Sequence, residues 1–278
     1  MRKIIVTTDF SKDSKAGIRF AMQLQLQAEC ELTFYHAVAI MKPTSWNDQR
    51  YKKFAAEAIA EYTKKLIAFV SGIAKKSAHS TKTYHYFVEI GTDVSDLVHR
   101  HAKKTKADFI CMASTGAGTF GRLLGTHTSS LIFTSTIPLL VIPKTYRTKR
   151  VSSLFYASDF SSLAKELAKV QMFARSVDAK IEVYHYDYLL HVPENRNKLS
   201  KKAKSVEAPN QTFSFIKKEV DDSLADCLSW DILKVKPSLL VLFTKRNRGW
   251  FERLFPSGTS ANVAHHAHVP MLIFQKNK

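Results

Sequence analysis

The stretch IIVTTDFS at residues 4–11 returns as LFYASDFS at residues 154–161, and this repetition decides the fold. Three more matches follow in the same order: LTFYH (32–36) with IEVYH (181–185), ADFICM (107–112) with PSLLVL (237–242), and STIPLLVIP (135–143) with AHVPMLIFQ (267–275). Four matches in one order, each separated by about 150 residues, indicate that one structural unit occurs twice.

The repeated runs are short, apolar and rich in β-branched and aromatic residues, which is typical of strands covered on both faces. Amphipathic patterns between them predict helices over residues 12–28, 47–77, 93–105 and 126–135. Strands that alternate with helices favour a parallel sheet in an α/β fold. We therefore expect two domains, 1–146 and 150–278, each with its own five-stranded parallel sheet; the polar, lysine-rich segment 191–210 is expected to be a short helix or a mobile loop.

Composition narrows the function classes. The 278 residues contain no apolar run long enough to cross a membrane and start without a signal-peptide pattern, so we expect a cytoplasmic protein that does not act on membranes. Three widely spaced cysteines argue against a disulfide framework and against a zinc ribbon.

The net charge of +18 is the outlier, and both halves are basic, with +11 over residues 1–149 and +7 over residues 150–278. Such a field favours anionic partners. The lysines are scattered along polar helix faces, so a solvated basic surface is favoured over a nucleic-acid groove.

Four of the nine glycines fall in MASTGAGTFGRLLGTHTSS, residues 112–130. Its GAGTFG matches the dinucleotide fingerprint G-x-G-x-x-G, but it follows the fourth strand, and no acidic residue stands about 20 positions later. What remains is a glycine loop before a helix that begins at Thr126. Its backbone N–H groups and the positive end of the helix favour phosphate.

Several motifs occur in one order: T-D-F-S after strand one, Y-H ending strand two, A-D-x-I-x-M on strand four, a glycine loop, L-G-T-x-T and I-P-L-L-V-I-P. With these motifs the sequence resembles the universal stress protein family. The resemblance covers essentially the whole chain, as a tandem of two domains. The resemblance implies an adenine nucleotide alpha hydrolase-like fold with strand order 3-2-1-4-5. It also implies that domains pair through their last strands, here 138–143 with 270–274.

The same resemblance implies an ATP site in the first half, with Mg²⁺ as a possible companion. The expected site residues are Thr8 and Asp9 for ribose and adenine, Ala37 for the base edge, Met112 and Ala113 on strand four, and Gly116, Gly118, Gly125, Thr126, His127 and Thr128 around the phosphates.

The chain departs from the family motif of G, two residues, G, nine residues, G and Ser or Thr. Ala113 replaces the first glycine, and the second spacing is one residue short, which Gly118 and Gly121 could absorb. The second half departs further, because Phe243 and Arg246 stand at its two glycine positions. We expect that half to lack ATP and to serve as a structural or regulatory partner.

No G-x-S-x-G, Walker or H-E-x-x-H motif occurs, and His265, His266 and His268 lack companion ligands, so we expect neither a catalytic set nor a metal site. The resulting hypothesis is an ATP-binding stress-response or signalling module, with an internal pseudo-dimer, a possible homodimer and an unidentified protein partner. Alternatives are a scaffold that binds no nucleotide, and a slow ATPase for which only Asp9 is a candidate base.

Overall fold

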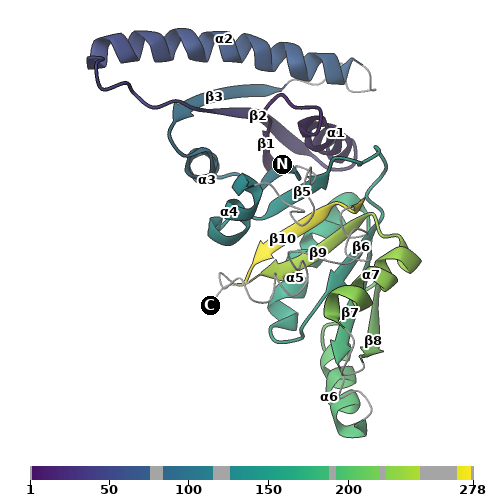
Figure 1. Ribbon diagram of the computed structural model, residues 1–278. Helices are drawn as coiled ribbons and strands as arrows, with labels where there is room; N and C mark the ends of the chain where they lie inside the picture. The colour runs from purple at the N-terminus through teal and green to yellow at the C-terminus, as the bar shows by residue number, and fades with distance from the viewer. Residues whose placement is uncertain are drawn as a thin grey trace.

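The computed structural model describes residues 2–75, 84–114, 126–187, 192–218, 223–244 and 268–276 (Figure 1). In the first half the elements are β1 (Arg2–Thr7), α1 (Ser14–Gln25), β2 (Cys30–Ala39), α2 (Asp48–Ala74), β3 (His85–Gly91), α3 (Val94–Lys104), β4 (Phe109–Ser114), α4 (Thr126–Thr134) and β5 (Leu139–Pro143). The second half contributes β6 (Ser153–Ala157), α5 (Leu163–Val177), β7 (Lys180–Asp187), α6 (Pro193–Lys204), β8 (Gln211–Lys217), α7 (Leu224–Val235), β9 (Leu239–Thr244) and β10 (Met271–Gln275).

All strands belong to a single ten-stranded sheet of order β3-β2-β1-β4-β5-β10-β9-β6-β7-β8. Within each half the order is 3-2-1-4-5 with parallel neighbours, as expected. The expected pairing of the last strands is confirmed, because β5 and β10 pair antiparallel, with Met271 opposite Val141. This pairing joins the two expected five-stranded sheets into one. Without this pairing, each half would expose the unsatisfied backbone groups of a short apolar edge strand.

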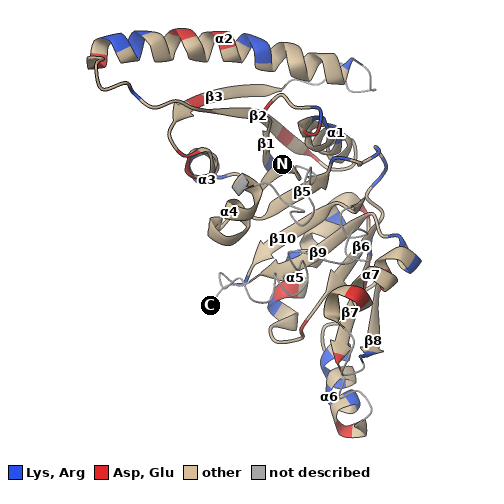
Figure 2. Cartoon of the chain, viewed as in Figure 1, with Lys and Arg blue, Asp and Glu red and all other residues tan. Residues whose placement is uncertain are grey.

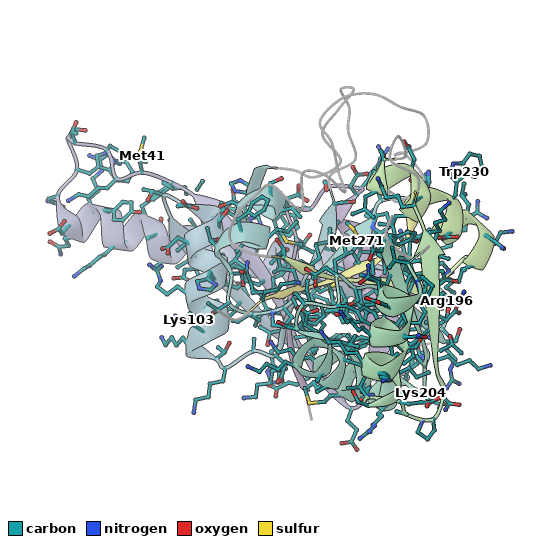
Figure 3. The ribbon with its side chains drawn as sticks, turned by 90° about the horizontal axis from the view of Figure 1, so that it is seen from below. Met41, Lys103, Arg196, Lys204, Trp230 and Met271 are labelled. Atoms are coloured by element: carbon teal, nitrogen blue, oxygen red, sulfur yellow. The ribbon has the colours of Figure 1, made fainter. Side chains whose placement is uncertain are left out.

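Two apolar clusters cover the two faces of the sheet, and alternation along the strands assigns residues to them. Ile4 and Val6 belong to the cluster beneath α1, α2 and α5, whereas Ile5 belongs to the cluster beneath α3, α4 and α7. Figure 3 shows Met271 of the central strand deep among side chains and Met41 at the far end of the first half. The runs therefore read as continuously apolar because both faces are buried.

The predicted helices are confirmed in the described residues. For segment 191–210 a short helix or a mobile loop was expected, and the structure has a short helix at 193–204. Asp93 caps α3 by accepting the N–H groups of Ser95 and Asp96. Asp13 occupies the cap position of α1, and the Ser14 N–H donates to Ser11 Oγ at 3.1 Å. The turn at residues 8–11 precedes α1, and the helix therefore begins at Ser14 and not at residue 12.

Lys and Arg residues lie along α2 and α6 and between β5 and β6, and Asp and Glu interrupt them in the view of Figure 2. Among the helices described, none combines the length and the apolar character that a membrane crossing requires.

Candidate functional site

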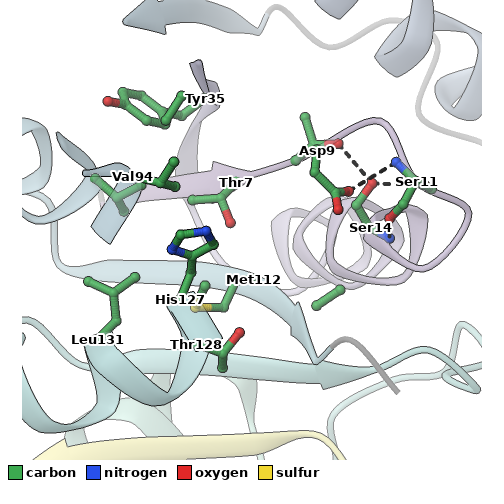
Figure 4. Close-up of a pocket in the computed structure, with 14 residues that line it drawn as sticks. Thr7, Asp9, Ser11, Ser14, Tyr35, Val94, Met112, His127, Thr128 and Leu131 are labelled. Carbon is green, nitrogen blue, oxygen red and sulfur yellow. Dashed lines mark hydrogen bonds between the residues drawn. The ribbon is translucent and has the colours of Figure 1, made fainter. Parts of the chain in front are cut away.

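A pocket opens at the carboxyl ends of β1, β2 and β4, beside the first turns of α3 and α4 (Figure 4). Its volume is about 190 Å³. The lining residues are Thr7, Thr8, Asp9, Ser11, Ser14, Tyr35, Ala37, Val94, Val98, Met112, Ala113, His127, Thr128 and Leu131. Open α/β sheets bind ligands at this edge, because every loop that follows a strand converges there.

The turn after β1 is built by side-chain hydrogen bonds. Thr8 Oγ1 lies 2.8 Å from Ser14 Oγ and accepts the Phe10 N–H at 3.1 Å. The Asp9 carboxylate accepts the Ser11 N–H at 3.0 Å. Phe10 itself has a φ of 64°, in the left-handed region that non-glycine residues seldom adopt. The side-chain bonds at Thr8 and Asp9 hold this strained turn and fix the direction of the Asp9 carboxylate.

The side chain of His36 supports the same turn. Its Nδ1 lies 2.7 Å from the Thr8 carbonyl oxygen, and its ring centroid lies 4.3 Å from that of Phe10. Burial lowers the pKa of His36, and the charge of Lys65 lowers it further. A neutral ring that donates Nδ1–H to Thr8 follows, so His36 acts as a structural support for the pocket. The second half repeats the arrangement, with His185 Nδ1 2.9 Å from the Ser158 carbonyl oxygen.

The pKa of Asp9 lies below its ordinary value. Partial burial acts to raise it, but the hydrogen bonds from Ser11, with smaller contributions from the Asp9 backbone and Ser14, together outweigh that effect. Asp9 is therefore ionised at neutral pH. It is the only Asp, Glu, Lys or Arg that the structure places in the described lining of the pocket.

The end of β4 forms the floor, and α1 approaches it closely. A Cβ placed on Gly17 would lie 3.2 Å from the Ala113 backbone nitrogen, so a side chain here would crowd the backbone of β4. Ala113 pairs with Ile142 in the regular β4–β5 ladder and is absent from the residues with positive φ. The alanine that replaces the first motif glycine is thus compatible with the backbone at this position.

The structure brings together seven of the expected site residues, namely Thr8, Asp9, Ala37, Met112, Ala113, His127 and Thr128. Thr126 is the first residue of α4. Gly116, Gly118 and Gly125 lie outside the described residues.

Sequence reasoning missed the apolar wall and part of the hydroxyl set, which are Thr7, Ser11, Ser14, Tyr35, Val94, Val98 and Leu131. Val98 and Leu131 are buried and look like core residues in the sequence. Their positions in the sequence could have indicated them, because residues that follow β1 and residues that begin α3 and α4 must meet at the carboxyl edge of the sheet.

In the second half, the carboxylate that corresponds to Asp9 is paired with a lysine. Lys276 Nζ lies 2.6 Å from Asp159 Oδ2, 3.1 Å from Glu166 Oε1 and 3.2 Å from Ser161 Oγ. The Tyr156 hydroxyl donates to Glu166 and accepts from Ser158. Counting from the repeats, Val6 and Ala16 of the first half correspond to Tyr156 and Glu166. A buried acid and a lysine thus stand where the first half has Ala16 and the exposed Lys144.

No group of three or more His, Cys, Asp or Glu side chains suited to a metal ion occurs in the part of the chain that the structure describes. The pocket therefore offers one carboxylate, several hydroxyls, an imidazole and an apolar wall. Such a set suits recognition of a polar ligand with an aromatic part by hydrogen bonds and packing.

Solved structures share the fold over the full length. The chain is similar to a universal stress protein from Archaeoglobus fulgidus DSM 4304, with a TM-score of 0.65, 14% identity, and coverage of 99% of this chain and 97% of that one. It is also similar to a protein of unknown function from Pseudomonas aeruginosa PAO1, with a TM-score of 0.59, 10% identity, and coverage of 99% and 92%. At these identities the likeness shows the fold alone.

No curated protein matches the chain. The model of the universal stress protein family, by contrast, matches residues 1–143, which include β1 to β5 and every residue that lines the pocket. With half of its length matched to that model, and with the tandem architecture described above, this chain belongs to the universal stress protein family.

Proposed function

We propose that the chain binds an adenine nucleotide, ATP, in the pocket of its first half and works as a nucleotide-responsive stress or signalling module. The observation that carries the proposal is the difference between Asp9 and Asp159. Asp9 is held in an open pocket without a lysine or arginine partner among the described residues, whereas Asp159 is neutralised by Lys276. An unpaired carboxylate in a pocket suits the hydroxyls of a ribose.

The lining divides into regions that fit the parts of a nucleotide. Tyr35, Val94, Val98 and Leu131 offer an apolar wall for the base, and Ala37 offers its backbone groups to the base edge. Thr128 and the N-terminus of α4 would meet the phosphates. The volume of about 190 Å³ is below the ~300–1,000 Å³ of whole-ligand pockets, so the described part would hold the nucleoside.

The second half has another task in this proposal. Its Lys276 pairs with both Asp159 and Glu166, so a ribose would have to compete with a buried ammonium for the Asp159 carboxylate. We assign this half the role of a partner domain that completes the sheet through β10. Nucleotide binding near α4 would then reach the second half directly, because Gln275 Nε2 donates to the Ile132 carbonyl at 2.7 Å.

The test compares two equivalent substitutions by calorimetric titration with ATP. Asp9→Asn should weaken binding about tenfold, since it removes a charge-assisted hydrogen bond to the ribose. Asp159→Asn, at the same position of the repeat, should leave the affinity within about twofold of wild type. Equal losses in both variants, or binding that neither variant changes, would contradict the assignment of the site to Asp9.

A further inference from the structure

His127 is a titratable group in the pocket, and the family resemblance gives its side chain no task beyond its backbone N–H. It belongs to the first turn of α4 and lines the pocket together with its neighbour Thr128. Figure 4 shows its ring in the middle of the site, between Val94 and Met112 and beside Thr7. The imidazole is therefore placed where a ligand would contact it.

Ser95 holds this ring in place. The distance between Ser95 Oγ and His127 Nδ1 is 3.3 Å, and Ser95 is only 6% exposed. The Ser95 backbone N–H is in turn bound to the Asp93 carboxylate at 2.8 Å. Within the described chain, Ser95 is the hydrogen-bonding partner of the His127 ring, and it uses Nδ1. The other ring nitrogen, Nε2, is left to meet a ligand.

The charged and titratable groups near His127 come from the turn after β1 and from α3, which also carries His99 and Arg100 about one turn beyond Ser95. Asp9 follows β1, and Asp93 and Asp96 lie at the start of α3. Asp93 is engaged as a helix cap, and Asp96 pairs with Arg100, which also binds Glu89. Residues 126–134 of α4 carry no other ionisable side chain. In the described pocket, protonated His127 would be the only positive charge available to an anionic ligand.

We propose that His127 is a proton-dependent contact for the anionic part of the nucleotide, so that the first-half site binds ATP more tightly as the pH falls. The inference rests on the proposed function and adds a regulation to it. Protonation turns Nε2 into a charged donor, and charge-assisted bonds to phosphate are about twice as strong as neutral ones.

The experiment is a calorimetric titration of ATP into the full chain at pH 8 and pH 6. The wild-type affinity should increase about tenfold between the two, as one charge-assisted bond predicts. His127→Gln should remove most of this increase, and His127→Lys should bind at pH 8 about as tightly as wild type does at pH 6. His85→Gln, a change on β3 outside the pocket, should behave like wild type. The phosphates of ATP also titrate, so the comparison between variants with the same ligand isolates the contribution of the protein.

The possible failures are distinct. If wild type binds ATP and His127→Gln shows the same pH dependence, the role of His127 is wrong and the proposed function stands. If His127→Lys binds more weakly than wild type at pH 8, a positive charge at this position does not face the phosphates, and the role is again wrong. If wild type binds no ATP at either pH, the proposed function fails and the regulation fails with it.

Discussion

The ammonium group of Lys276 lies 2.6 Å from the carboxylate of Asp159, and both belong to the second half of the chain. Lys144, the equivalent of Lys276 in the repeat, is exposed, and no described lysine or arginine pairs with Asp9. The two halves therefore share a fold but differ in how the equivalent aspartates are paired. In one half the acidic position is satisfied internally, and in the other it faces a pocket.

The buried lysine should contribute to stability far more than its exposed counterpart. Lys276→Met leaves Asp159 and Glu166 close together without a cation, and we expect the free energy of unfolding to fall by about 3 kcal/mol. Lys144→Met should change it by less than about 0.5 kcal/mol, because its side chain is solvated. Urea unfolding followed by circular dichroism measures both values, and similar losses would show that the buried ion pairs do not stabilise the second half.

Acid should destabilise the fold partly through Asp159. Burial acts to raise the pKa of this carboxyl, but Lys276 and Ser161 outweigh burial, and the pKa lies below its ordinary value. The folded state therefore binds fewer protons than the unfolded state near the ordinary pKa of about 3.9. The resulting stabilisation is complete above that pKa and is lost as the pH falls through the lower pKa of the folded state.

Unfolding midpoints in urea between pH 5 and pH 2.5 test this behaviour. Wild type should lose stability steadily over that range, and Asp159→Asn should lose less because one of the carboxyls responsible is gone. An unchanged slope in the variant would show that Asp159 does not contribute to the acid sensitivity.

Gly17 should be needed for the floor of the pocket. A methyl group there would press on the Ala113 backbone nitrogen at 3.2 Å, and backbone yields less readily than a side chain. Gly17→Ala should therefore cost about 1–3 kcal/mol of stability and weaken ATP binding.

Gly72→Ala is the matched control for this change. It adds the same methyl group within α2, where nothing lies within 4 Å, and should stabilise the protein by up to about 1 kcal/mol. Denaturant unfolding and ATP titration of both variants decide the point. A harmless Gly17→Ala would mean that α1 can move away from β4 without cost.

Much of the fold could be predicted from the sequence because the repeat carries it. The runs 4–11 and 154–161 mark equivalent strands, and the order of the four matches indicates the order of elements within each half. The pairing of β5 with β10 was expected from the family resemblance alone, since the apolar pattern of 139–143 is the same whether its neighbour is a helix, a second molecule or β10.

The candidate site could be predicted only in part. The residues after β1 and in the first turn of α4 stand next to recognisable motifs, whereas Val98 and Leu131 carry no mark that separates a pocket wall from a core. The ion pair between Lys276 and Asp159 could not be predicted from the sequence either. Lys144 and Lys276 follow similar strands, but only Lys276 has a buried acid, Glu166, to pair with. The counterpart of Glu166 in the first half is Ala16, which requires no cation.

The stoichiometry of ATP binding tests the central claim most directly. A calorimetric titration of the intact wild-type chain at neutral pH should give one site per chain, since Asp9 faces an open pocket whereas Asp159 is paired with Lys276. Two sites per chain, or the absence of any binding heat at every ATP concentration up to the millimolar range, would contradict the account.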